Sequence, residues 1–281
     1  MIKLTILWYN VLRGFHRKEK DGLYSLERDR LKAAKDIIES QNADIVLLGE
    51  GDFNPLCKIK GEKIKIIDYQ KEFNYPYVYY AEPDAETSRK SEVILSKFEI
   101  KCKNYSSPKD KLFTHIKTRV TLANEHILID MVHPYPTISE KEKANWIGKI
   151  IGKNSKRYIL LGDFNALSPL DRYNEKELLE AFYNFSGDMK KARRNVEDSL
   201  KCLMLKKVIS KRLIDTYYNK NKEQAGTQPT KKYLLEGHKQ QIRFDYIFCS
   251  EDFKILKSGI IKNKLTELAS DHYPIYATLE I

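Results

Sequence analysis

The sequence predicts a four-layer α/β sandwich, in which two mixed β-sheets pack against each other and helices cover both outer faces. Three observations favour this class. Short apolar runs at residues 44–48 and 158–161 indicate buried strands. Segments with apolar residues at helical spacing lie near them, and this strand–helix–strand order recurs loosely in both halves of the chain. No repeat and no linker rich in Pro, Gly or Ser divides the 281 residues, so we expect one domain over residues 1–281.

The first half begins with a strand at residues 2–9 that ends at Asn10. A helix is predicted over residues 25–41, with Ser25 as its N-cap and apolar residues at helical spacing. The strand at 44–48 then delivers Glu50 to the same end of the sheet as Asn10. The lysine-rich residues 51–75 show no pattern that assigns them to an element.

Five further strands are predicted before the middle of the chain. They cover residues 77–81, 92–96, 98–105, 112–122 and 126–132, and the last three are expected to be antiparallel. His133 emerges where the last of these strands ends. His115 and His126 have no comparable context and are interpreted as surface or strand-face histidines.

The second half alternates helices and strands. Ser139 and Glu142 form a capping box at the start of a helix over 139–152. A helix at 176–185 and strands at 242–249, 253–261 and 274–281 complete the prediction, and residues 203–213 can be read as an ordinary amphipathic helix with a solvated basic face.

The stretch from Gly162 to Asn165 follows the buried strand at 158–161. If the backbone stays extended there, Asp163 and Asn165 point to one side while Phe164 points into the core. A carboxylate and a carboxamide in one small volume suit a metal-assisted phosphate site, because together they offer hydrogen-bond donors, acceptors and a place for a cation. The alternative is an ordinary Asx turn after a strand.

The chain is basic, with 50 Lys and Arg against 39 Asp and Glu and a formal net charge of +11. This balance favours polyanionic partners such as nucleic acid or an anionic lipid surface, although a solvated lysine-rich surface is the alternative. Residues 186–233 hold most of the excess, with 13 Lys and Arg against 5 Asp and Glu, and form a basic insertion. Its interleaved tyrosines suit a bound phosphate backbone with stacked bases. They are Tyr217, Tyr218 and Tyr233.

The cysteines and the hydropathy pattern indicate a cytoplasmic protein. The four cysteines lie far apart without a C-x-x-C spacing, so neither a zinc site nor a disulfide framework is predicted. The apolar N-terminus is too short for a signal sequence, and no run of about 18 apolar residues is present. We therefore expect no stable membrane association, and we expect a monomer.

Six short segments together resemble the endonuclease/exonuclease/phosphatase family, whose best-known fold is that of DNase I. They occur in the family's order and the resemblance spans residues 2–281. The segments are Tyr9-Asn10-Val11, Leu47-Leu48-Gly49-Glu50, Val132-His133-Pro134, Gly162-Asp163-Phe164-Asn165, Arg243-Phe244-Asp245-Tyr246-Ile247 and Ser270-Asp271-His272-Tyr273-Pro274.

The resemblance implies roles for the polar residues of these segments in hydrolysing a phosphodiester. His272 would be the general base, with Asp245 holding its other ring nitrogen. His133, paired with Glu82, would bind a phosphate oxygen or protonate the leaving oxygen. Glu50, Asp271 and Asn10 would hold Mg²⁺ or Mn²⁺. Asp163 and Asn165 would position the attacking water or the phosphate. Arg89 and Lys90 would contact a phosphate of the substrate.

Two features of the sequence bear on the subclass. The family branches that resemble DNase I, sphingomyelinases and phosphoinositide phosphatases carry a histidine at the position of His133, whereas abasic-site endonucleases do not. Gly49 stands where the family usually has glutamine, and the disulfide cysteines of the secreted nuclease are absent.

The resemblance therefore predicts a divalent-metal-dependent nuclease, acting on DNA rather than RNA. Two alternatives remain: the same chemistry on an inositol phosphate or sphingomyelin-like headgroup, and a non-catalytic basic module that binds nucleic acid.

Overall fold

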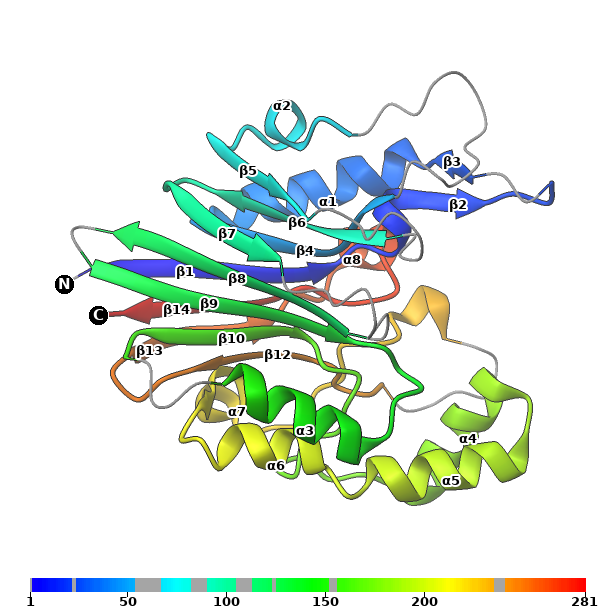
Figure 1. Ribbon diagram of the computed structural model, residues 1–281. Coiled ribbons are helices and arrows are strands. Elements are labelled where there is room, and N and C mark those ends of the chain that lie inside the picture. Colours follow the sequence, from blue (N-terminus) through cyan, green and yellow to red (C-terminus); the bar gives the residue numbers. More distant parts are fainter. Residues whose placement is uncertain are drawn as a thin grey trace.

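Two six-stranded β-sheets pack face to face in the computed structural model, with helices on both outer sides (Figure 1). The structure describes residues 2–21, 24–53, 67–81, 90–104, 113–122, 125–151, 156–234 and 241–281. The predicted α/β sandwich of two mixed sheets is therefore confirmed.

The first sheet combines the N-terminal strands with the two C-terminal ones. Across the sheet its strands are β13 (Lys254–Ile260), β14 (Ile275–Glu280), β1 (Lys3–Asn10), β4 (Ile45–Phe53), β6 (Lys90–Ser96) and β5 (Tyr77–Tyr80). β1 and β4 are parallel, and the other neighbours are antiparallel. This parallel pair carries Asn10 and Glu50 to the same edge, because Asn10 lies opposite Gly49.

The second sheet is built from the middle of the chain. Its strands, in order, are β11 (Ile214–Asp215), β12 (Asp245–Cys249), β10 (Tyr158–Asp163), β9 (Glu125–Pro134), β8 (Phe113–Leu122) and β7 (Ile100–Asn104). β9 and β10 are parallel, and Gly162 lies opposite Val132. His133 and Asp163 therefore follow directly at the same end of this sheet. A separate hairpin consists of β2 (His16–Lys18) and β3 (Tyr24–Leu26).

The helices form the two outer layers. The first sheet is covered by α1 (Arg28–Gln41), α2 (Tyr69–Phe73) and α8 (Lys264–Ala269), and the second by α3 (Glu140–Ile150) and α6 (Leu203–Ile209). α4 (Glu175–Ser186) and α5 (Met189–Ser199) form a helical hairpin, and α7 (Thr216–Asn221) packs on β12 and β13. Two 3₁₀ turns, η1 (Arg13–Phe15) and η2 (Lys231–Tyr233), complete the elements.

The main core fills the space between the two sheets. Trp8 of β1 is fully buried there, in one cluster with Met131 of β9 and Leu161 of β10. Each such side chain contributes about 1.5–3 kcal/mol to folding through burial of its apolar surface. This shared core fixes the position of one sheet relative to the other, and with it the position of the polar strand ends.

The helix starts show where local sequence signals hold and where they fail. The capping box at Ser139 is present, with Ser139 Oγ 3.3 Å from the backbone N of Glu142. Ser25, in contrast, is not an N-cap, because it pairs with Arg17 in the β2–β3 hairpin. α1 begins at Arg28 after Glu27.

Two other predictions on the chain's elements need correction. The helix expected at residues 203–213 ends at Ile209, because the chain turns at Arg212, where φ is 61°, and enters β11. Within residues 51–75, which showed no pattern, β4 continues to Phe53 and α2 occupies Tyr69–Phe73, while 54–66 lie outside the described residues.

Gly162 lets β10 approach β9 at the point where both strands reach the polar cluster. Its φ is +146°, and a Cβ built there would lie 1.9 Å from the carbonyl oxygen of Val132. Replacing Gly162 by alanine is therefore expected to destabilise the protein by about 3 kcal/mol or more, measured by urea denaturation.

Gly187 provides the matched control for this prediction. It also has a positive φ, +67°, but a Cβ there would meet nothing within 4 Å. Gly187→Ala is expected to cost only the backbone strain, about 1–2 kcal/mol. Equal losses in the two variants would contradict the steric argument.

Candidate active site

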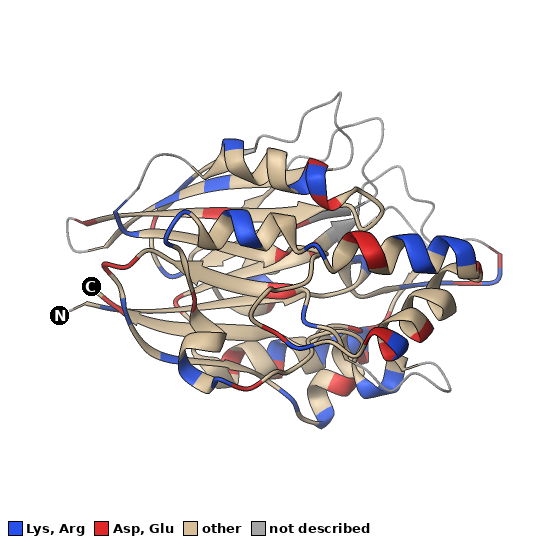
Figure 2. Cartoon of the chain, turned by 90° about the horizontal axis from the view of Figure 1, so that it is seen from below, with Lys and Arg blue, Asp and Glu red and all other residues tan. Residues whose placement is uncertain are grey.

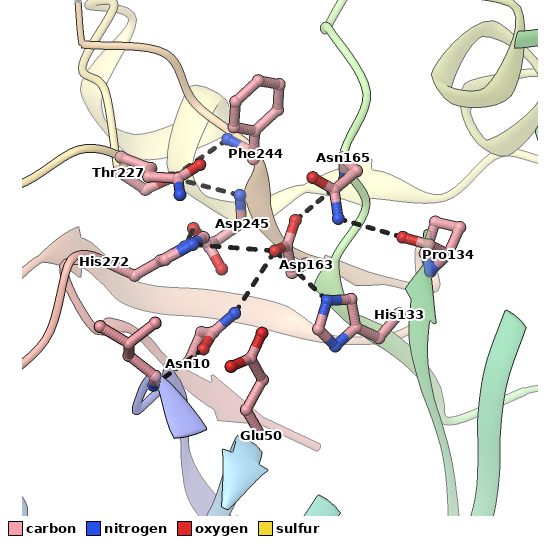
Figure 3. A network of polar contacts seen from close by, with 12 residues as sticks. Asn10, Glu50, His133, Pro134, Asp163, Asn165, Thr227, Phe244, Asp245 and His272 are labelled. Atoms are coloured by element: carbon pink, nitrogen blue, oxygen red, sulfur yellow. Dashed lines mark hydrogen bonds and ion pairs between the residues drawn. The ribbon is translucent and has the colours of Figure 1, made fainter. Parts of the chain in front are cut away.

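Polar residues from both sheets meet at one end of the sandwich (Figure 3). Most of them lie where strands end or begin, and Glu50 lies inside β4 at the register shift between Leu48 and Asp52. The first sheet supplies Asn10, Glu50 and, just before β14, His272, and the second supplies His133, Asp163, Asn165 and Asp245.

Asp163 lies at the centre of this group and is buried. Its Oδ2 lies 3.6 Å from Nε2 of His133 and 3.8 Å from Nε2 of His272. Nδ2 of Asn10 lies 3.5 Å from the same oxygen. Two imidazoles and one amide thus converge on a single carboxylate oxygen, which is the arrangement shown in Figure 3.

His272 is held by Asp245, as the sequence predicted. The Nδ1 atom of His272 lies 2.8 Å from Oδ2 of Asp245, and both side chains are buried. The other carboxylate oxygen, Oδ1, accepts a hydrogen bond of 2.6 Å from the indole N–H of Trp8. Charge-assisted bonds of this length fix the ring orientation and leave Nε2 facing Asp163.

His133 is held by Glu92 of β6, a residue that the sequence analysis missed. Nδ1 of His133 lies 3.1 Å from Oε1 of Glu92. The second oxygen, Oε2, accepts a hydrogen bond of 2.7 Å from the backbone N–H of Glu50. One buried carboxylate therefore positions an imidazole from one sheet and Glu50 from the other.

The residue expected in this role, Glu82, lies outside the described residues. A signal for Glu92 was present in the sequence, since a lone carboxylate stands directly before the apolar run Val93–Leu95. A charged residue that is 3% exposed in such a strand needs a partner, and His133 provides it.

The charges of the site raise the pKa of both imidazoles. Burial lowers the pKa of His272, but Asp245, Asp271 and Asp163 outweigh it and raise the value to about 10. Burial likewise opposes the charged form of His133, but the hydrogen bond that the ring donates to Glu92, together with the nearby carboxylates, raises its pKa to about 9. In the absence of ligands both rings are therefore protonated at neutral pH and attract an anion.

The pKa of Asp163 is raised as well. Burial and the charge of Asp245 raise its pKa to about 6, against the lowering effect of the two histidines. Asp163 is thus ionised at pH 7 but titrates close to neutrality, which suits a group that holds a water molecule.

Of the three residues expected to hold a metal, Asn10 and Asp271 both contact Ser270, and Glu50 directly follows Gly49, the strand partner of Asn10. Oγ of Ser270 lies 2.7 Å from the backbone O of Asn10 and 3.2 Å from Oδ1 of Asp271. Glu50 has a φ of 54°, and its Oε2 accepts a hydrogen bond from the backbone N–H of Arg13. Carboxylate and amide oxygens of this kind fit Mg²⁺ or Mn²⁺, which prefer hard oxygen ligands.

A second group could also hold a cation. Ligand atoms of Asp163, Asp245 and His272 all lie within 4.8 Å of one another. Both oxygens of Asp245, however, already accept short hydrogen bonds from Trp8 and His272. A cation in this group would compete with those bonds, so the oxygen donors of Asn10, Glu50 and Asp271 fit a hard cation better.

Asn165 does not continue the extended strand, so the expected alternation is wrong at this residue. Its φ is 45°, and its backbone N–H donates to Oδ1 of Asp163 over 2.9 Å, as in an Asx turn. The side-chain Nδ2 donates to the carbonyl oxygen of Pro134, and the buried Lys143 donates to the Asn165 carbonyl. The Asx turn after β10 therefore forms part of the polar site. Phe164 is buried, as predicted.

The position of the Trp8 ring explains why residue 49 is a glycine. A Cβ at position 49 would lie 2.5 Å from the Trp8 ring, so the indole that holds Asp245 occupies the space of a side chain before Glu50. The departure from the family pattern at Gly49 is therefore linked to the hydrogen bond that positions Asp245.

The other predicted residues lie apart from this network or cannot be placed. Arg89 lies outside the described residues, and Lys90 begins β6 with a side chain that is not described. His115 pairs with Asp130 on the strand face at 2.9 Å, and His126 contacts Thr121. Cys102, Cys202 and Cys249 are free thiols, and Cys57 is outside the described part of the chain.

A two-sheet sandwich with helices on both outer sides and a polar site at the strand ends is the fold of a family of phosphoric ester hydrolases. The chain belongs to the endonuclease/exonuclease/phosphatase family, whose model matches residues 7–272. A comparison of the sequence with curated proteins gives no match.

Solved structures of the same fold cover nearly the whole chain. An endonuclease/exonuclease/phosphatase from Beutenbergia cavernae superposes with a TM-score of 0.65 at 16% identity, covering 99% of this chain and 72% of that one. D. rerio TDP2 complexed with single strand DNA product gives 0.59 at 14% identity, covering 99% of each chain. An AP endonuclease from Archaeoglobus fulgidus gives 0.59 at 18%, covering 99% and 100%. At these identities the likeness shows the fold.

Proposed function

We propose that this protein is a Mg²⁺- or Mn²⁺-dependent phosphodiesterase that hydrolyses nucleic acid, with DNA as the favoured substrate. The observation that carries the proposal is the convergence of two carboxylate-held imidazoles on Asp163, with distances of 3.6 and 3.8 Å. The protonated ring of His133, and the imidazolium that forms when His272 takes the proton of the attacking water, both stabilise a phosphate whose oxygens gain charge during the reaction.

Each residue has a distinct role in this mechanism. His133, protonated and held by Glu92, binds a non-bridging oxygen or protonates the leaving oxygen. Asp163 and Asn165 position the attacking water, and Nε2 of His272 takes its proton while Asp245 stabilises the resulting imidazolium.

Glu50, Asp271 and Asn10 would hold the divalent cation. The bound ion would supply charge stabilisation at the phosphate, and its positive charge would lower the pKa of His272 from about 10 towards the range in which a base acts. These residues are coupled to the two carboxylate–imidazole pairs, because Glu92 contacts both His133 and the backbone N–H of Glu50, and the charge of Asp271 raises the pKa of His272.

Charge and family support nucleic acid as the substrate. The net charge of +11 favours a polyanion, and solved relatives of the same fold are described with DNA or as AP endonucleases. The histidine at position 133 argues against abasic-site repair, because the resemblance places that branch among proteins without it. Within the described residues, no helix combines the length and apolar character needed to cross a membrane.

We also propose that residues 1–281 act as one cytoplasmic, monomeric domain with a basic insertion at 186–233. The two sheets share one apolar core, which supports a single cooperative unit. The insertion contains α5, α6, β11, α7 and η2.

A substrate panel tests the proposal. Duplex DNA, single-stranded DNA, RNA, 5′-tyrosyl DNA, inositol phosphates and sphingomyelin are incubated with Mg²⁺ or Mn²⁺, and in parallel with EDTA. We expect cleavage of DNA that EDTA abolishes. Turnover of an inositol phosphate or sphingomyelin without DNA cleavage would favour the small-headgroup alternative, and DNA binding with no turnover would favour a non-catalytic module.

A further inference from the structure

The α4–α5 hairpin is attached to the chain segments that carry the site. Leu178 and Ala181 of α4 and Val196 of α5 pack in one apolar cluster with Leu167 and Ile242. Leu167 is two residues beyond Asn165, and Ile242 is three residues before Asp245. The hairpin therefore lies next to the loops that deliver these polar groups.

Its attachment is rigid as well as close. Oδ2 of Asp198, near the end of α5, accepts a hydrogen bond of 2.8 Å from the backbone N–H of Glu140, at the start of α3. Gly187 ends α4 with a φ of +67°, and the side chain of Asp188 caps α5. The apolar cluster and these polar bonds together fix the orientation of α5 relative to the site.

The outward face of α5 is strongly basic (Figure 2). Lys190, Lys191, Arg193 and Arg194 are all exposed, and within the described part of the chain none of them forms an ion pair. Three like-charge pairs at spacings of three or four residues each destabilise a helix by about 0.2–0.5 kcal/mol. The acids of α5 do not offset this cost fully, because Asp198 pairs with Lys201 instead.

Apolar side chains are exposed at the turn that precedes this basic face. Phe185 is 81% exposed, and Tyr183 and Met189 are 41% and 43% exposed. Exposed aromatic rings beside cations are typical of surfaces that bind single-stranded nucleic acid, where bases stack on the rings and phosphates pair with the charges. A lipid surface would instead favour an exposed apolar face along the helix, whereas Ala192 and Val196 of α5 are buried and Met189 is its exposed apolar residue.

The β2–β3 hairpin carries further exposed positive charge, on the side of the first sheet. Figure 1 shows α4–α5 and the β2–β3 hairpin extending beyond the strand ends that carry the site. Lys18 and Lys20 are exposed at the β2–β3 hairpin. A phosphate backbone that passes the site can therefore meet positive charge on both sides.

We propose that α5, with the aromatic turn at Tyr183 and Phe185, binds the phosphate backbone and a base of single-stranded DNA on one side of the scissile bond. This inference rests on the proposed function, because it assumes that the site acts on nucleic acid. In this proposal the α4–α5 hairpin contributes to the affinity for the DNA strand, and the residues around Asp163 carry out the hydrolysis.

The test is the salt dependence of binding of a labelled single-stranded oligonucleotide to the full chain, in EDTA. Each phosphate contact contributes about 0.7 to the slope of log K against log salt, so the double variant K190A/R194A is expected to lower its magnitude by about 1.4. These two residues lie four apart on one face of α5. The double variant K3A/K257A removes the same charge from exposed lysines of β1 and β13, outside the basic insertion, and should change the slope little.

Phe185→Ala provides a second, uncharged test. It is expected to weaken binding by about 5- to 150-fold through lost stacking, with the salt slope unchanged. Circular dichroism and thermal melts verify that each variant is folded.

An unchanged slope in K190A/R194A, with DNA still cleaved by the unmodified protein, would overturn the inference while leaving the proposed function intact. If the unmodified protein neither bound nor cleaved DNA, both would fail together. Binding of phosphatidylserine vesicles that is lost in K190A/R194A, with DNA binding unaffected, would assign the hairpin to lipid and overturn the inference.

Discussion

Replacing His272 by alanine is expected to lower kcat for DNA hydrolysis by about 10²–10⁴-fold, the usual contribution of a general base. The reason is geometric, because Nε2 of His272 faces Asp163 while Nδ1 is held 2.8 Å from Asp245. Initial rates at saturating substrate and Mg²⁺ measure the effect. The protein should remain folded, as monitored by its thermal melt, since the polar ring leaves a cavity without breaking a strand ladder.

Asp245→Asn should lose most of the same activity, because an amide does not stabilise the imidazolium or fix the tautomer. The double variant of His272 and Asp245 should be hardly slower than His272→Ala alone, since the two residues act as one unit. His126→Ala is the control, because His126 contacts only Thr121 among the described residues and lies at the start of β9. Multiplicative losses in the double variant would show that Asp245 acts independently of His272.

Removal of divalent cations is expected to abolish hydrolysis, and addition of Mg²⁺ or Mn²⁺ should restore it. Glu50→Gln should raise the Mg²⁺ concentration required for half-maximal activity by tenfold or more, because one carboxylate is lost from a site with few charged ligands. The readouts are activity as a function of free Mg²⁺ and calorimetric titration of Mn²⁺ into the protein.

Glu39→Gln serves as the control for the metal prediction. Glu39 lies on the exposed side of α1, and its carboxylate lies 4.0 Å from the ammonium group of Lys35. Its replacement removes the same charge from a residue outside the proposed metal ligands. An equal shift in Mg²⁺ dependence for both variants would mean that Glu50 acts through the overall charge and not as a ligand.

Local sequence signals predicted most elements because they depend on short-range physics. The capping box at Ser139 and the apolar runs of β4 and β10 need no distant partner to be recognised. Ser25 failed as an N-cap because the β2–β3 pairing, which involves residues eight apart, competes with helix capping. That competition is decided by tertiary packing and is invisible in a local pattern.

The polar site likewise combines residues that the sequence predicted with contacts that depend on tertiary packing. Most of its residues were predicted from the segments around Asn10, Glu50, His133, Asp163 and His272, and the structure brings these five together. The observed partner of His133, Glu92, was not predicted. Its carboxylate joins the two sheets, because it contacts His133 and accepts a hydrogen bond from the backbone N–H of Glu50.

By itself, the sequence determined the two mixed sheets, the order of the strands that end in polar residues, and the family to which the chain belongs. Only the tertiary structure decided which groups touch: Glu92 with His133, Trp8 with Asp245, and the basic face of α5 beside the site loops. The physical reason is that periodicity and capping act over a few residues, whereas hydrogen bonds between residues such as Trp8 and Asp245 depend on how two separately formed sheets pack.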